Sequence, residues 1–251
     1  MPRLAYAADC TALLQQDMPR WLVLDRLPDT LQQLYMLEDA PEYVPLYANT
    51  RYAAHLDYSP LLVRANQSRS AVWRAYVEGL GERPLRGVVV TATATQDDVV
   101  MHLRQRLEAR FDGQRRGLLR FYDPWIAAHL FSHDSPDSTW LGPLERVVWH
   151  GGTFEQRAAS GVTWYAWHVD AEQSLPLSPP PPSSPQDTAP LTLAPAQVSA
   201  LGRYAAHWPL WRHYAERHGL QASSREHISR FLNACRETEP LSLPLDERRE
   251  S

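Results

Sequence analysis

The chain has 251 residues, of which 44% are hydrophobic and 22% charged, a composition typical of a globular protein with a substantial core. A formal net charge of −4 argues against nucleic-acid binding, and no uncharged apolar run approaches the ~18 residues of a membrane span. The N-terminus lacks a signal pattern, and Cys10 and Cys235 are too few for a disulfide framework, so we expect free thiols in a cytoplasmic protein.

Short apolar runs predict strands in the first half of the chain. The clearest is Gly87–Thr93, because it is rich in β-branched residues and nearly continuous, as in a central strand covered on both faces. Three further runs have strand character: Trp21–Asp25, Tyr43–Ala48 and Pro60–Arg64. Pro45 lies in the second of these, and it suits either a strand at the edge of a sheet or the start of a strand.

Helical spacing predicts helices between these strands. The first expected helix begins at Asp29, where Gln32 completes a capping box. The second begins at Ser68 or Ser70, and the third begins at Thr95 and reaches Arg110. Two more strands follow later, Arg146–Trp149 and Val162–Val169, and alternation places Trp164 and Trp167 of the second on opposite faces. The repeated strand–helix order predicts an α/β fold with a mixed or mostly parallel sheet flanked by helices.

The stretch Gly117–Phe131 predicts a strand that turns abruptly into a helix. An apolar run from Leu118 to Tyr122 is followed by Asp123, a preferred N-cap residue, and by Pro124, which suits a first helical position. Capping accounts for Asp123 without any catalytic role.

A change in composition after residue 170 predicts the domain organisation. Seven prolines, with serines among them, lie between residues 176 and 190, a composition typical of an extended linker. We therefore expect an α/β domain at 1–172, a linker at 173–194, a small all-helical lobe at 195–237 and a frayed tail at 238–251. Pro209 is expected to kink the lobe's first helix, and Ser223 with Glu226 to cap a helix bearing Ile228, Phe231, Leu232 and Cys235.

The order of these elements and one short motif carry a family resemblance. The motif is RFYDP at Arg120–Pro124, and upstream lie WLVLD at 21–25, PLYANT at 45–50, SPLLVRA at 59–65 and RGVVVTATATQDDVVMHLRQRL at 86–107. Over roughly residues 21–150 the chain resembles the type VI secretion effector adaptors, filed as domain of unknown function 4123. Many relatives carry a second arginine after the Asp-Pro pair, where this chain has Trp125.

The resemblance implies a non-enzymatic adaptor that binds a cognate toxic effector and loads it onto the tip or C-terminal extension of the secretion spike. It implies no nucleic acid or membrane as a partner. We expect the RFYDP residues Arg120, Phe121, Tyr122, Asp123 and Pro124 to be structural. Candidate effector anchors are the aromatic and basic residues of the helical lobe, because Trp, Tyr and Arg are enriched at interface hot spots: Trp208, Trp211, Arg212, Tyr214 and Phe231.

Packing inside the lobe is an equal alternative for Trp208, whereas Trp211 and Arg212, beyond the expected kink, are predicted to be exposed.

No catalytic signature accompanies these patterns. There is no phosphate-binding loop and no nucleophile elbow. His129 and His133 are four residues apart on an expected helix and could face one metal ion, but no third ligand is apparent. We therefore expect no catalytic residue, no metal and no cofactor.

An enzyme with a small-molecule site at the carboxyl edge of the sheet is the alternative. If the strands are parallel, one edge would gather the polar residues that follow or cap the elements: Asp25, Thr91, Thr93, Thr95 and Asp123. Convergence of these side chains would favour the enzyme, and capping of separate helices would favour the adaptor.

Overall fold

The computed structural model describes residues 2–14, 18–65, 70–111, 115–132, 140–161, 163–169, 191–220 and 225–238. Residues 173–190 of the expected linker and 239–251 of the expected tail lie outside this set, as do Ser68, His133 and Ser223.

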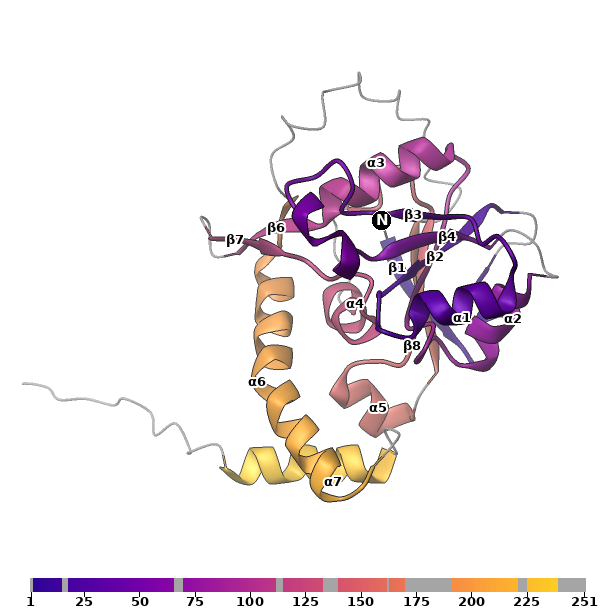
Figure 1. The fold of residues 1–251 in the computed structure, drawn as a ribbon. Coiled ribbons are helices and arrows are strands. Elements are labelled where there is room, and N and C mark those ends of the chain that lie inside the picture. The colour runs from indigo at the N-terminus through magenta and orange to yellow at the C-terminus, as the bar shows by residue number, and fades with distance from the viewer. Residues whose placement is uncertain are drawn as a thin grey trace, which may run out of the picture.

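A seven-stranded sheet forms the centre of the fold (Figure 1). Its order is β1-β9-β8-β5-β2-β4-β3, and every neighbouring pair is antiparallel. The strands are β1 (Pro2–Ala7), β2 (Arg20–Leu24), β3 (Tyr43–Pro45), β4 (Leu61–Arg64), β5 (Gly87–Thr91), β8 (Arg146–His150) and β9 (Trp164–Val169). As predicted, β5 is central and buried along its whole length, and the short β3 lies at an edge.

The α/β class is confirmed, but the expectation of a mixed or mostly parallel sheet is wrong for this large sheet. The helices α1 (Thr30–Leu37) and α2 (Ala71–Glu78) do connect strands of the same direction, β2 with β3 and β4 with β5. These strands are not neighbours, because β4 lies between β2 and β3, and β2 lies between β4 and β5. Each crossover therefore skips one strand, and the skipped strand runs antiparallel to both.

Helices cover both faces of the sheet. On one face α1 and α2 pack with the 3₁₀ helix η1 (Cys10–Leu13), and on the other lie α3 (Gln96–Arg106) and α4 (Pro124–Phe131). Trp164 packs on the first face and Trp167 on the second, which confirms the predicted alternation. A second 3₁₀ helix, η2 (Ala53–Tyr58), lies between β3 and β4 in the chain.

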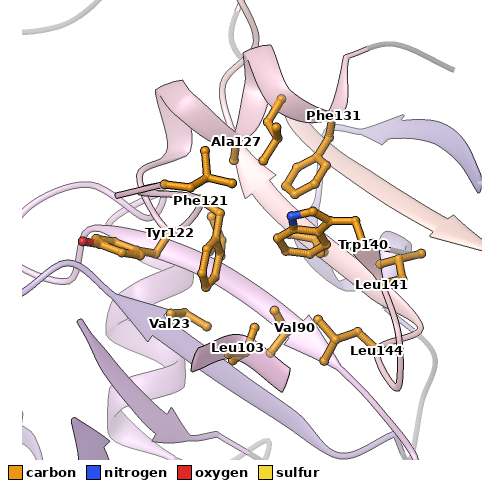
Figure 2. Close-up of a cluster of buried hydrophobic side chains, with 14 of the residues drawn as sticks. Val23, Val90, Leu103, Phe121, Tyr122, Ala127, Phe131, Trp140, Leu141 and Leu144 are labelled. Atoms are coloured by element: carbon orange, nitrogen blue, oxygen red, sulfur yellow. The ribbon is translucent and has the colours of Figure 1, made fainter. Parts of the chain in front are cut away.

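Trp140 is the centre of the core beneath α4, as Figure 2 shows. Its ring centre lies 4.6 Å from that of Phe131 and 5.4 Å from that of Phe121, both in edge-on geometry. Phe131 in turn stacks on Trp167 of the sheet at 4.9 Å. The C-terminal end of α4 is thereby fixed against the sheet through aromatic contacts.

A small second sheet corrects three predicted boundaries. It contains β10 (Leu191–Thr192), β6 (Glu108–Phe111) and β7 (Arg115–Leu118) in that order. The helix expected to reach Arg110 ends at Arg106, and the strand expected to reach Tyr122 ends at Leu118. Two residues of the expected linker, Leu191 and Thr192, are part of this sheet, because β10 pairs in parallel with β6.

Helix starts depend on backbone conformation as well as on residue type. Ser70 and Thr95 cap α2 and α3 as predicted, each accepting a backbone N–H three residues on. Asp29 does not cap α1, because its φ of −95° and ψ of −10° are helical rather than extended, and no capping box with Gln32 forms. The Thr30 hydroxyl fixes this corner instead, accepting from the Leu27 N–H at 3.0 Å.

The C-terminal helices α6 (Pro195–Arg217) and α7 (Arg225–Thr238) pack on the rest of the protein. α6 lies along α4, and α7 lies against α5 (Phe154–Ser160) (Figure 1). α6 continues through Pro209 as one helix, with the proline exposed. These helices share one apolar cluster with α4 and α5, called here the C-terminal aromatic cluster: Trp125, Phe154, Trp211, Ile228, Phe231 and Leu232.

In the part of the chain that the structure describes, no helix combines the length and apolarity needed to cross a membrane. Neither Cys10 nor Cys235 is in a disulfide.

Candidate functional site

The RFYDP motif forms the turn that leads into α4. Asp123 has an extended backbone, and its Oδ1 accepts the N–H of Trp125 at 3.0 Å, so it is the N-cap that the sequence predicts. Pro124 is the first helical residue. Phe121 and Tyr122 point into the core between the sheet and α4 (Figure 2).

Two ion pairs tie this turn to one end of the sheet. Arg120 Nη2 lies 2.6 Å from Asp25 Oδ2, and Arg86 Nη2 lies 2.6 Å from Asp123 Oδ1. Asp25 follows β2 and Arg86 precedes β5, and the antiparallel pairing of Leu24 with Gly87 brings these residues to the same edge. We call the four charged residues the Arg–Asp lattice.

The two acidic side chains of the Arg–Asp lattice are shielded from solvent, and this affects the pKa of Asp25. The Asp25 and Asp123 side chains are almost buried, whereas Arg120 is 42% exposed. Burial raises the pKa of Asp25 above its ordinary value, and the neighbouring Arg120 offsets part of that rise. Asp123 accepts both a backbone N–H and a guanidinium N–H, so it joins the helix cap to the sheet edge.

Two phenols complete the turn. The hydroxyls of Tyr122 and Tyr47 hydrogen-bond at 3.2 Å, and the Arg120 guanidinium lies 5.7 Å from the Tyr122 ring centre. Burial is the main cause that raises the pKa of Tyr122 far above its ordinary value, so this phenol stays protonated. Each motif residue thus has a structural role. Arg120 forms an ion pair, Phe121 packs in the core, Tyr122 donates or accepts a hydrogen bond, Asp123 caps α4 and Pro124 begins it.

A buried arginine joins the turn to the C-terminal aromatic cluster. Arg157 of α5 is 1% exposed, its guanidinium lies 3.8 Å from the Trp125 ring centre, and its Nε donates to Gly152 O at 2.8 Å. Burial lowers the pKa of Arg157 to about 10. No local signal in the sequence marks Arg157, because its partner Trp125 lies on another helix.

Gly151 makes room for Arg157, which gives a testable prediction. A Cβ at Gly151, where φ is +79°, would lie 2.0 Å from Arg157 Nη2, whereas a Cβ at Gly161, where φ is +77°, meets nothing within 4 Å. Gly161→Ala should cost only backbone strain, roughly 1–3 kcal/mol, because φ +77° and ψ −159° lie in a region that is essentially restricted to glycine. Gly151→Ala should cost roughly 1–2 kcal/mol beyond its own backbone strain, because the buried guanidinium must be displaced.

Urea unfolding of both variants measures this difference. In an Arg157→Met background the excess cost of Gly151→Ala should disappear, since the clash is then removed. An equal cost of Gly151→Ala in the wild-type and in the Arg157→Met background would show that Arg157 moves aside freely.

Most of the predicted effector anchors are not exposed. Trp211 and Phe231 are 6% and 3% exposed and lie inside the C-terminal aromatic cluster, so the expectation of an exposed Trp211 is wrong. Trp208 is half-buried against Trp125, with ring centres 5.3 Å apart, and Tyr214 is half-buried and stacks on Trp211 at 5.8 Å. Arg212 alone of the five is exposed, as predicted. The aromatic residues hold α6 and α7 in place.

The enzyme alternative requires five polar residues at one edge of the sheet, but the structure does not bring them together. Asp25 and Asp123 meet in the Arg–Asp lattice, but Thr91 ends β5 at the opposite end of the sheet, where it pairs with Arg20 and Arg146. Thr95 caps α3. The edge shared by all five residues does not form, because the neighbouring strands are antiparallel.

His129 is packed inside the protein. Its Nδ1–H donates to Trp125 O at 2.8 Å, its ring lies 4.9 Å from that of Tyr204, and burial lowers its pKa. His133 lies outside the described residues, so the proposed pair is not seen. Within the described ranges, no group of three or more His, Cys, Asp or Glu side chains could hold a metal ion.

Comparison with known proteins gives one finding. Residues 20–139 match the sequence profile of the family described as "Domain of unknown function (DUF4123)". The matched segment spans β2 to the RFYDP turn and α4, and so contains the whole Arg–Asp lattice. No curated protein and no solved structure matches the chain.

Proposed function

We propose that this protein is a non-enzymatic cytoplasmic adaptor that binds a toxic effector and loads it onto the spike of a type VI secretion system. The observation that carries the proposal is the match of residues 20–139 to DUF4123, together with the resemblance of the RFYDP motif to the effector adaptors of that system. The effector and the tip or C-terminal extension of the spike are the two partners of the proposal.

The contacts of the motif agree with an adaptor. Each of the five residues from Arg120 to Pro124 has a role in holding the turn, so the motif is accounted for without a reaction. α6 packs along α4, the helix that follows the motif. Its outer side is therefore presented from a firmly held position. A rigid platform with a fixed helical surface suits the binding of another protein, because little ordering accompanies association.

The test uses the toxin encoded beside this gene. The two proteins, each soluble alone, should co-purify when they are co-expressed, and deletion of the adaptor should abolish secretion of that toxin. Secretion of the tube protein of the same system is the control and should continue, because an adaptor is not part of the injection machinery. Unchanged toxin secretion after deletion, or a toxin that does not co-purify, would refute the proposal.

A further inference from the structure

The outer side of α6 carries an exposed stripe whose spacing is that of a helix contact. Five residues recur at intervals of three and four, which places them on one face of the helix. All five are exposed, and they are Arg203, Ala206, Leu210, His213 and Arg217. Leu210 is 56% exposed, so the stripe has an apolar centre between basic ends. The inward side of the helix is a different set, with Gln197, Ala200 and Trp211 buried.

Two residues on this outer side have low helix propensity, and no contact within the described chain accounts for their presence in α6. Gly202 lies inside α6, is exposed, and a Cβ there would meet nothing within 4 Å. A helical glycine costs about 0.5–1 kcal/mol relative to alanine, and no contact within the described chain offsets that cost. Pro209, also exposed, cannot donate a backbone hydrogen bond. Departures from local propensity of this kind are expected at functional surfaces.

The charge of the stripe identifies its occupant. α6 and α7 together carry six arginines against three glutamates, although the whole chain has a net charge of −4, and the stripe itself contains no carboxylate. A second copy of this chain is disfavoured: Arg203 would face Arg217 in an antiparallel pairing, and each arginine would face itself in a parallel pairing. The apolar centre at Ala206 and Leu210 fits a protein side chain better than a phosphate backbone.

We propose that this α6 stripe docks an acidic amphipathic helix of the cargo. Carboxylates of that helix pair with Arg203 and Arg217, an apolar side chain packs on Leu210, and Gly202 with Ala206 allows the two backbones to approach closely. The inference rests on the proposed adaptor function, since it names the surface and the chemistry through which the cargo is held.

The first experimental arm uses the neighbouring toxin and variants at exposed positions. Arg203→Glu/Arg217→Glu and Leu210→Asp should each weaken toxin binding at least about tenfold, whereas Arg236→Glu, at an exposed position of α7, should leave it within about twofold. Gly202→Ala separates docking from folding, because it should raise the melting temperature and yet weaken binding. Equal toxin binding by wild type and all stripe variants would overturn the docking surface and leave the adaptor function intact.

The second arm needs no toxin. The probe is a fluorescein-labelled, 21-residue helical peptide with leucine at its central contact positions and glutamate around them, and its control has lysine for every glutamate. Anisotropy at 150 mM NaCl should show tighter binding of the acidic peptide to wild type, by about tenfold over the control and over the Arg203→Glu/Arg217→Glu variant. No preference for the acidic peptide, or tighter binding of a DNA duplex to the same face, would overturn the inference. Binding of the acidic peptide to a protein that fails to bind the toxin would refute the adaptor function and leave the docking surface standing.

Discussion

Replacing Trp211 by alanine should lower the free energy of unfolding by about 4 kcal/mol, within the ~3–5 kcal/mol range for a buried tryptophan. The side chain is 6% exposed and contacts Phe154, Tyr214 and Phe231, with ring centres 5.4–6.1 Å apart. Its loss leaves a cavity where α5, α6 and α7 meet. Urea unfolding followed by circular dichroism measures the change.

Arg212→Ala is the matched control at the next residue of the same helix. Arg212 is exposed, and its removal should change the free energy of unfolding by no more than about 0.5 kcal/mol. The pair separates two roles for the tryptophan. An interface anchor would lose toxin binding with little change in stability, and that outcome at Trp211 would contradict its assignment to the core.

The second large effect is expected at Asp123, where one carboxylate has two partners. Asp123→Ala should destabilise the protein by about 3 kcal/mol, of which about 1 kcal/mol is the lost N-cap and the rest the lost bond to Arg86. Asp123→Asn should cost roughly half as much, because asparagine is an equally good cap but carries no charge. Thermal and urea unfolding of the two variants test this ordering.

Asp29→Ala is the control for the Asp123 series. Asp29 also precedes a helix, but it is exposed and its side chain makes no capping bond, so its replacement should cost less than about 0.5 kcal/mol. A similar cost at Asp29 and Asp123 would mean that residue type alone determines these helix starts. Equal costs for Asp123→Ala and Asp123→Asn would assign the whole effect to the ion pair with Arg86.

Local features of this chain could be predicted from the sequence because their causes are local. The caps at Ser70, Thr95 and Asp123 depend on a side chain and a backbone N–H two or three residues away. The strand β5 and the opposite faces of Trp164 and Trp167 follow from composition and from alternation. The amphipathic face of α7 likewise follows from its spacing.

Strand direction and the site could not be predicted in this way. A strand–helix–strand pattern indicates two strands of the same direction, but it does not reveal that a third strand from elsewhere in the chain lies between them. Arg120 and Asp25 are 95 residues apart, and nothing near either residue indicates that they pair. The burial of Trp211 similarly depends on α5 and α7, so the helix that carries it contains no signal that distinguishes a core residue from an exposed anchor.

The position of β1 in the sheet has a consequence for synthesis on the ribosome. Among the strands that the structure describes, β1 pairs with β9 alone. Its residue Ala7 lies opposite Trp164, so more than 150 further residues must be translated before β1 has this partner. At ~5–20 residues per second this wait lasts roughly 10–30 s. During that interval β2, β3, β4 and β5 can already assemble, whereas the nascent N-terminal strand remains open to chaperones that recognise extended polypeptide.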